Sequence, residues 1–297
     1  MNRKQRFLSD LMHFCGTLVI IGLVLLGLVM IVSGGTVYTD VVSPAVEVRC
    51  SDCLGSGTVI KVPGTEEILI LTAGHVVEES MKGHDETRLD GDGNPHVEHI
   101  KKPSPVKIFT KHGHTESVVP AEVVWYSSPD DQGGHDLALL KPDKVDGLNP
   151  AVLGLDEELT VGEEVWYCGS PAGLTGQLEK SIINSLDQDL DFSDRMFLTV
   201  NGLGWHGSSG SGIFVKRTDM IGCGKSQDGY KLVGVLVMGD DETPKSPCFC
   251  EPQQVIKDFL ESYTRSKTVP ITPDEPTKTG VMELILPPLM PSLPPDD

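Results

Sequence analysis

Apolar residues form one long run near the N-terminus and many short runs after it. Residues 14–32 contain no charged residue, and as a helix they would measure about 28 Å, close to the ~30 Å apolar core of a bilayer. Arg3, Lys4 and Arg6 precede this run, whereas no basic cluster follows it. The pattern predicts a single-pass membrane anchor with a cytoplasmic N-terminus, which places everything after about residue 35 outside the cytoplasm.

Two alternatives to the membrane anchor have weaker support in the sequence. A cleaved signal peptide has a shorter apolar core than residues 14–32, and a small-residue Ala-x-Ala site follows it. A buried core helix of a soluble protein rarely has so long an unbroken apolar run. With a retained anchor or with a cleaved signal, the rest of the chain is expected to be exported.

Beyond this run, short segments rich in Val, Ile and Thr alternate with turn residues, and no helical period is sustained. This pattern predicts about a dozen short strands and an all-β fold of barrels or sandwiches. The expected strands are residues 36–42, 45–49, 57–62, 68–72, 107–110, 121–126, 136–141, 164–168, 177–186, 196–200, 212–216 and 231–238.

Residues 78–105 interrupt the strand pattern because they are polar, charged and contain proline, and we expect a long surface insertion there. The run Asp-Gly-Asp-Gly-Asn at 90–94 resembles the start of a calcium-binding loop. Pro95 and Lys101, however, occupy the positions where an EF-hand needs Gly and Glu. Five histidines in and after this segment match no defined metal site and are expected to face solvent: His84, His96, His99, His112 and His114.

One helix is predicted beyond the anchor, at residues 253–262. Its apolar residues fall on one stripe, which consists of Val255, Ile256, Phe259 and Leu260. The following tail is rich in Pro and is expected to be disordered or polyproline-like, with binding to the groove of a partner protein as an alternative.

Composition and charge narrow the class of protein further. The 297 residues include 32 Gly and 21 Pro, which favours short strands and turns over long helices. The formal net charge of −19 argues against binding to nucleic acids or to anionic lipid headgroups, because both repel an acidic surface.

The chain has seven cysteines. Cys15 lies in the predicted anchor, and Cys168 lies in an apolar strand pattern that predicts a buried free thiol. Cys223 could close a hairpin through a disulfide with Cys248 or Cys250, which an exported compartment permits.

A structural zinc ion is the alternative for four of these cysteines. Cys50 and Cys53 form one closely spaced pair and Cys248 and Cys250 another, and two such pairs can share one tetrahedral ion. The sequence does not choose between zinc, disulfides and free thiols. No cofactor is expected for the chemistry described next.

Three separated fragments carry residues that can do chemistry. LTAGHVV at 71–77 places His75 after an apolar strand, and DLALLK at 136–141 opens a strand with Asp136. GSSGSGIF at 207–214 is a glycine-rich loop that contains Ser209 and leads into a strand. Each fragment alone has an ordinary explanation: a structural histidine, an aspartate that ends a turn, and a flexible loop.

Together, the three fragments contain every group that acyl transfer by a hydroxyl nucleophile needs. A serine requires a base to take its proton, a carboxylate to orient that base and backbone N–H donors for the oxyanion. Glycines beside the serine permit the backbone conformations that turn N–H groups toward that oxygen. The order His75, Asp136, Ser209 therefore predicts a catalytic triad.

These fragments resemble motifs of the chymotrypsin-like serine peptidases, and most of all those of the HtrA/Deg group. GSGTVI at 55–60 is similar to a strand of that family, and residues 165–186 resemble the start of its second barrel. LVGV at 232–235 is similar to the strand that follows its nucleophile. The resemblance spans about residues 45–260. It implies an all-β fold of two perpendicular six-stranded β-barrels, with the active site in the cleft between them, and serine endopeptidase activity.

The resemblance also implies a domain organisation. We expect a cytoplasmic stub and anchor at 1–35, a first barrel at 36–150 with the insertion, a second barrel and helix at 151–265, and the tail at 266–297. Too few residues follow the peptidase unit for the PDZ domain that HtrA proteases carry. The expected partners are a protein or peptide substrate and, through the anchor, the membrane.

Three serines crowd the nucleophile loop, and the family pattern selects Ser209. It alone has glycine two positions before it and one position after it, at Gly207 and Gly210. The resemblance then implies an oxyanion hole formed by the N–H groups of Gly207 and Ser209, with Ser208 between them. The loop departs from the family's GNSGGPL at Ser211 and at the next position, neither of which supplies a catalytic group in the family.

The interval between His75 and Asp136 is longer than in compact members of the family, and the insertion at 78–105 accounts for it. Asp130 and Asp131 are alternative carboxylates. Neither of them opens an apolar strand, so Asp136 is preferred.

The substrate pocket is expected from family position alone. Leu203, Val237 and Met238 would line an apolar pocket that favours a small or medium aliphatic side chain before the cleaved bond. Asp240 and Asp241 would instead attract a basic side chain. The aliphatic preference is the prediction adopted.

Three other functions are weighed against an anchored endopeptidase. The first is a catalytically silent binding module on the same fold, against which the complete triad argues. The second is a maturation peptidase of a virus or mobile element. The third is a scaffold built from the anchor and the tail, which would leave the triad motifs unexplained.

Overall fold

The computed structural model describes residues 36–50, 53–81, 84–89, 95–100, 106–112, 115–128, 134–190, 193–202, 204–221, 225–239 and 247–268. The predicted anchor at 14–32 and the tail beyond residue 268 lie outside these ranges. Among the helices within them, none has both the length and the apolar character needed to span a bilayer. The described chain is mostly β-structure, as the strand pattern predicts.

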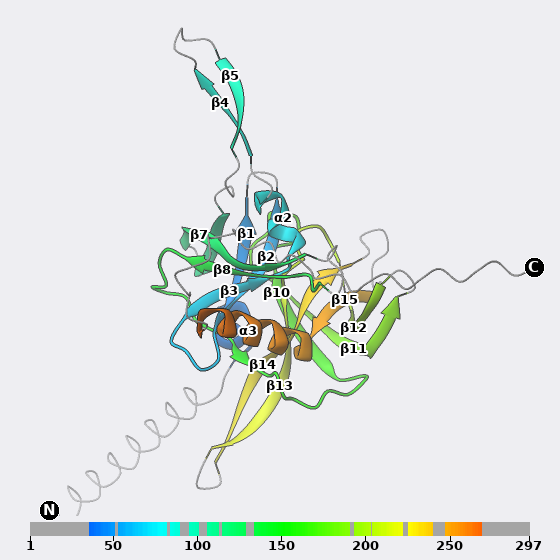
Figure 1. Ribbon diagram of the computed structural model, residues 1–297. Helices are drawn as coiled ribbons and strands as arrows, with labels where there is room; N and C mark the ends of the chain where they lie inside the picture. The colour runs from blue at the N-terminus through cyan, green and yellow to red at the C-terminus, as the bar shows by residue number, and fades with distance from the viewer. Residues whose placement is uncertain are drawn as a thin grey trace, which may run out of the picture.

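Six antiparallel strands from the first half of the chain close into a barrel in the order β1-β2-β3-β8-β7-β6 (Figure 1). Strands β3 and β8 have continuous apolar runs whose side chains are nearly all buried, which means that both faces of these strands are covered. Each large apolar side chain buried in this way contributes about 1.5–3 kcal/mol. The strands are Ala45–Arg49 (β1), Leu54–Lys61 (β2), Ile68–Thr72 (β3), Val106–His112 (β6), Thr115–Ser127 (β7) and Leu137–Pro142 (β8).

The second half of the chain forms a ring of six antiparallel strands in the order β13-β10-β11-β12-β15-β14, which pairing between β13 and β14 closes. A seventh short strand, β9 (Val152–Leu153), pairs in parallel with β14 and distinguishes this ring from the expected six-stranded barrel. The ring strands are Glu164–Gly169 (β10), Gln177–Leu190 (β11), Ser193–Asn201 (β12), Gly212–Ile221 (β13), Lys225–Met238 (β14) and Pro247–Pro252 (β15).

The C-terminal helix α3 (Gln253–Thr268) packs its apolar stripe against the main core, as its sequence pattern predicts. It is longer than expected because its last turns are held by the first barrel. Tyr263 Oη donates a hydrogen bond to Glu67 over 3.1 Å, and Lys267 forms an ion pair with the same carboxylate over 2.6 Å. The helix therefore connects the end of the second ring to the first barrel.

The predicted strand at 36–42 is wrong. Residues Tyr38–Val42 form a short π-helical turn (η1) instead. Thr36 and Thr39 exchange hydrogen bonds between their hydroxyl and backbone groups, and the Asp40 carboxylate accepts the N–H of Tyr230. The local bonds between Thr36 and Thr39 compete with strand pairing, and the bond from the distant Tyr230 holds the turn in place.

The surface insertion contains more regular structure than its polar sequence suggests. It begins within the short helix α2 (His75–Met81) and continues into a two-stranded antiparallel hairpin, His84–Leu89 (β4) and Pro95–Ile100 (β5). Figure 1 shows that this hairpin projects away from the barrel. The insertion therefore lengthens the chain between β3 and β8 without separating these two strands, which remain paired.

Candidate active site

His75 and Asp136 are brought together by two neighbouring strands of the first barrel. β3 ends at Thr72 and β8 begins at Leu137, and the antiparallel pairing sets Thr72 opposite Ala138. The chain leaves β3 and enters α2 at His75, while Asp136 comes immediately before β8. Both residues therefore lie at the same end of the barrel.

His75 makes two hydrogen bonds with Asp136. Its backbone N–H donates to Asp136 Oδ1 over 2.7 Å, and its ring atom Nδ1 lies 2.6 Å from Oδ2. The Asp136 side chain is 7% exposed, whereas that of His75 is 37% exposed. A buried carboxylate beside Nδ1 keeps the proton on that nitrogen, which leaves Nε2 as the acceptor that a general base needs.

Ser209 lies in the loop between β12 and β13, close to the beginning of α2. A Cβ atom on Gly55 of β2 would be 2.5 Å from a methyl group of Val76 and 3.1 Å from the carbonyl oxygen of Ser209. Val76 is the neighbour of His75, so a single glycine separates the histidine helix from the serine loop. The structure thus brings the three predicted triad residues to one region.

The loop around Ser209 has two N–H groups without an acceptor among the described residues, those of Gly207 and Ser209. Gly207 has φ +92° and Gly210 has φ +90°, conformations that glycine adopts without strain. The Ser208 N–H donates to the carbonyl of Trp205 over 2.9 Å and is not available to an oxyanion. Of the three residues expected at the oxyanion hole, Gly207 and Ser209 therefore have N–H groups with no acceptor within the described part of the chain.

Ser56 of β2 fixes the serine loop from the first barrel. Its buried hydroxyl donates to the carbonyl of Gly207 over 2.6 Å and accepts the N–H of Ser170 over 2.8 Å. Its own N–H donates to the carbonyl of Ser209 over 2.7 Å. The serine of the GSG motif at 55–57 therefore positions the nucleophile loop, a role that the resemblance did not indicate.

A second contact orients the peptide bond that carries the Gly207 N–H. Ala172, in the short 3₁₀ turn η2 (Pro171–Gly173), donates its N–H to the carbonyl of His206 over 2.7 Å. The carbonyl of His206 and the N–H of Gly207 belong to the same planar peptide unit and point in opposite directions. Ala172 therefore holds this N–H away from η2. Ala172 has φ +51°, the sole positive φ among the described non-glycine residues.

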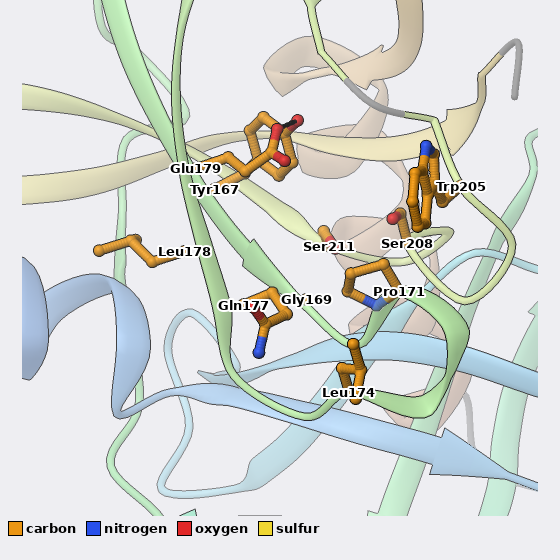
Figure 2. A pocket seen from close by; sticks show the side chains of 10 residues that line it. All are labelled: Tyr167, Gly169, Pro171, Leu174, Gln177, Leu178, Glu179, Trp205, Ser208 and Ser211. Atoms are coloured by element: carbon orange, nitrogen blue, oxygen red, sulfur yellow. Dashed lines mark hydrogen bonds between the residues drawn. The ribbon is translucent and has the colours of Figure 1, made fainter. Parts of the chain in front are cut away.

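A cavity of about 200 Å³ lies beside the serine loop (Figure 2). One wall consists of Trp205, Ser208 and Ser211, and the opposite wall comes from β10, η2 and β11. At one end of the cavity, the Tyr167 hydroxyl donates a hydrogen bond to the Glu179 carboxylate. The resemblance did not indicate this cavity, although the exposed Trp205 so close to a nucleophile loop is a signal that could have found it.

The expected substrate-pocket residues are only partly placed. Leu203 lies outside the described residues, and so do Asp240 and Asp241. Val237 is buried in the main core, and Met238 is half-buried against it. The backbones of Gly204 and Gly239 lie so close together that a Cβ on Gly239 would be 2.2 Å from Gly204 Cα.

The four cysteines of the alternative zinc site do not come together. Cys50 and Cys53 are joined by a disulfide, whereas Cys248 and Cys250 are buried thiols in the core of the second ring. Cys168 is a buried thiol, as predicted. In the part of the chain that the structure describes, no group of three metal-binding side chains is found. Cys15 and Cys223 lie outside that part.

Comparison of the sequence with known protein families identifies the family of this chain. The family model for the trypsin-like peptidase domain matches residues 55–222, which is more than half of the chain. The chain belongs to the trypsin-like peptidase family. Among curated proteins, none matches its sequence.

Solved structures of HtrA and Deg proteases resemble this trypsin-like peptidase domain at low sequence identity. The HtrA-type protease AlgW, solved with a tripeptide, is 16% identical and has a TM-score of 0.52, with 76% of this chain and 61% of that chain covered. Rv3671c from M. tuberculosis is 18% identical, with a TM-score of 0.48 and 76% and 89% covered. A serine endoprotease from Yersinia pestis is 19% identical, with a TM-score of 0.49 and 77% and 66% covered. The likeness to AlgW supports the chymotrypsin-like fold. In the described chain, helix α3 follows the second ring and no PDZ domain is present.

Proposed function

We propose that this trypsin-like peptidase domain is an active serine endopeptidase. Ser209 is the nucleophile, His75 the general base and Asp136 the carboxylate that orients His75. The observation that carries the proposal is the buried Asp136 carboxylate on Nδ1 of His75, next to a loop in which two N–H donors have no acceptor among the described residues. Membership of the trypsin-like peptidase family supports it.

The proposed reaction proceeds in two halves. Nε2 of His75 takes the proton of the Ser209 hydroxyl as Oγ bonds to the carbonyl carbon of the substrate peptide. The oxyanion accepts hydrogen bonds from the N–H groups of Gly207 and Ser209, and His75 then gives its proton to the leaving amine. In the second half, His75 deprotonates a water molecule that hydrolyses the acyl-enzyme and restores Ser209. The reaction needs no cofactor.

Two further features belong to the proposal. We place the peptidase domain outside the cytoplasm on a single-pass anchor at 14–32, supported by the apolar run and the basic residues before it. The substrate is a protein or peptide, as membership of a peptidase family implies. An aliphatic residue before the cleaved bond is the proposed preference, through Leu203, Val237 and Met238.

Labelling of the full chain with a fluorophosphonate tests the proposal, because this reagent reacts only with an activated serine. Wild-type protein is expected to be labelled, and Ser209→Ala is expected to be unlabelled. A folded wild-type protein that resists labelling would leave a catalytically silent binding module as the better account.

A further inference from the structure

The Asp136 backbone is held by a residue of the second ring. Its N–H donates to Glu251 Oε1 over 3.0 Å, although the two residues are 115 positions apart. Glu251 lies on β15 and is fully buried. A buried carboxylate is therefore aimed at the residue that orients His75.

Arg195 of β12 completes this contact from the neighbouring strand. Its guanidinium group forms an ion pair with Glu251 Oε1 over 2.8 Å and donates to the carbonyl of Gly134 over 3.3 Å. The same group lies over the ring of Phe197, with 4.8 Å between its central carbon and the ring centroid. Arg195 and Glu251 thus hold both ends of the three-residue segment 134–136.

We infer that Glu251, supported by Arg195, is a positioning residue that fixes the Asp136 backbone and thereby the direction of the His75 imidazole. This inference rests on the proposed function, because it concerns the same triad. The Asp136 carboxylate accepts two bonds from His75, so a small rotation of the Asp136 backbone displaces the histidine ring. Displacements of about 1 Å in an active site cost about 100-fold in rate.

A purely structural role explains this pair less well. Burial raises the pKa of Glu251, while the Arg195 charge and the Asp136 N–H oppose that rise and the Asp136 carboxylate adds to it. Apolar side chains in place of both Glu251 and Arg195 would fill the same space without burying a charge, and replacement of a whole buried ion pair in this way is often neutral or stabilising. What an apolar residue cannot supply is an acceptor for the Asp136 N–H.

The test compares three variants of the full chain. Glu251→Leu removes the acceptor, and Glu251→Gln keeps an acceptor oxygen but removes its charge. Glu67→Gln is the matched control, because Glu67 also ties the first barrel to an element of the second half, through Tyr263 and Lys267 of α3. Glu67 lies just before β3, whereas His75 lies beyond the other end of that strand.

The first readout is the rate of fluorophosphonate labelling of variants shown to be folded by circular dichroism. Glu251→Leu is expected to be labelled about 100-fold more slowly than wild type. Glu251→Gln is expected to be about fivefold slower, because a hydrogen bond to a neutral acceptor is weaker than one to a charged acceptor. Glu67→Gln is expected to stay within about twofold of wild type. If Glu251→Leu does not fold, the labelling rate of Glu251→Gln tests the inference in its place. Wild-type rates in the folded Glu251 variants, or an equal loss in Glu67→Gln, would overturn the inference.

The second readout does not depend on catalysis. It therefore tests the positioning role of Glu251 separately from the proposed peptidase activity. The proton on Nδ1 of His75 gives a low-field proton resonance while it is held by Asp136. That resonance is expected in wild type and Glu67→Gln and is expected to shift or disappear in Glu251→Leu. If the wild-type protein is not labelled, the proposed function is wrong. In that case this resonance alone tests whether Glu251 positions His75 through Asp136. An unchanged resonance in Glu251→Leu overturns that role.

Discussion

The Nδ1 atom of His75 lies 2.6 Å from Oδ2 of Asp136, although 61 positions separate the two residues in the chain. The pairing of β3 with β8 sets this distance, and the projecting hairpin between them does not disturb it. The insertion lies between β3 and β6 in the chain and leaves the pairing of β3 with β8 intact. Asp136, rather than Asp130 or Asp131, is therefore the carboxylate expected to orient His75.

Replacement of Asp136 by Asn is expected to reduce the rate of peptide hydrolysis by about 10⁴-fold. An amide cannot hold the proton on Nδ1 of His75, so the ring loses the tautomer in which Nε2 accepts a proton. The measurement is kcat/KM on a cleaved peptide. Asp143→Asn is the control, since this exposed aspartate follows the same strand. A rate for Asp136→Asn within tenfold of wild type would contradict the assigned role.

Gly210→Ala is expected to destabilise the fold and to abolish labelling of Ser209. Gly210 has φ +90°, and its added Cβ would be 1.9 Å from the carbonyl oxygen of Ser56, so the serine loop must move away from the first barrel. Gly64→Ala is the matched control, because Gly64 has φ +74° and nothing lies within 4 Å of its added Cβ.

Urea unfolding of both glycine variants measures the difference. Gly64→Ala should cost only the backbone strain, about 1–2 kcal/mol, and should keep its labelling rate. The loss in the free energy of unfolding caused by Gly210→Ala should be clearly larger than that caused by Gly64→Ala. Equal losses for the two variants would show that the approach of Ser56 to Gly210 is unimportant.

The strands of both barrels could be predicted because their apolar patterns are local. Residues 45–49 and 68–72 form strands with the predicted bounds. Strand β15 was missed because Cys248 and Cys250 suggested metal or disulfide chemistry, although they alternate inward as strand residues do. The turn at 36–42 was predicted wrongly because its hydrogen bond to Tyr230 involves a residue far along the chain.

In the candidate site, too, the residues within local motifs could be predicted and the distant contacts could not. His75, Asp136 and Ser209 each belong to a short motif that can be recognised in the sequence. The residues that hold them in place could not be recognised in this way. Ser56 is hydrogen-bonded to Gly207, 151 positions away, and Glu251 to Asp136, 115 positions away. The glutamate in CFCEP at 248–252 was a signal, since a charge is rarely buried on a strand among apolar residues without a partner.

The ion pairs around Glu157 predict a pH-dependent stability. Lys231 and Arg217 bind its carboxylate at 2.8 and 2.9 Å, and the hydrogen bond from Lys231 is the main cause that lowers its pKa below the usual 4.5. A lowered pKa gives stability that is present above the unfolded value and is lost as the pH falls through the folded value.

Glu157→Gln is therefore expected to be less stable than wild type by about 1 kcal/mol at pH 7. The difference should shrink as the pH falls below 4.5, where the wild-type carboxylate becomes protonated. Thermal unfolding of both proteins at several pH values between 7 and 3 measures it. A difference that stays constant over this range would exclude the charged pairs as its source.

The buried thiols are expected to be unreactive in the folded protein. Burial raises the pKa of Cys168 to about 12 and that of Cys248 to about 11, and it raises that of Cys250 as well. A thiol reacts as its thiolate, which is scarce at pH 8 when the pKa is this high. Alkylation with iodoacetamide, followed by mapping of the modified peptides, should modify these three residues only after denaturation. Modification of Cys168 or Cys250 in the folded protein would contradict their placement in the cores.

The most direct test of the account is the location of the fluorophosphonate adduct on the full chain. Three serines lie within four positions of one another in GSSGSG, so peptide mapping by mass spectrometry must distinguish Ser209 from Ser208 and Ser211. The account predicts an adduct on Ser209 alone and no adduct in Ser209→Ala. A folded protein without an adduct, or an adduct on Ser208 or Ser211, would contradict it.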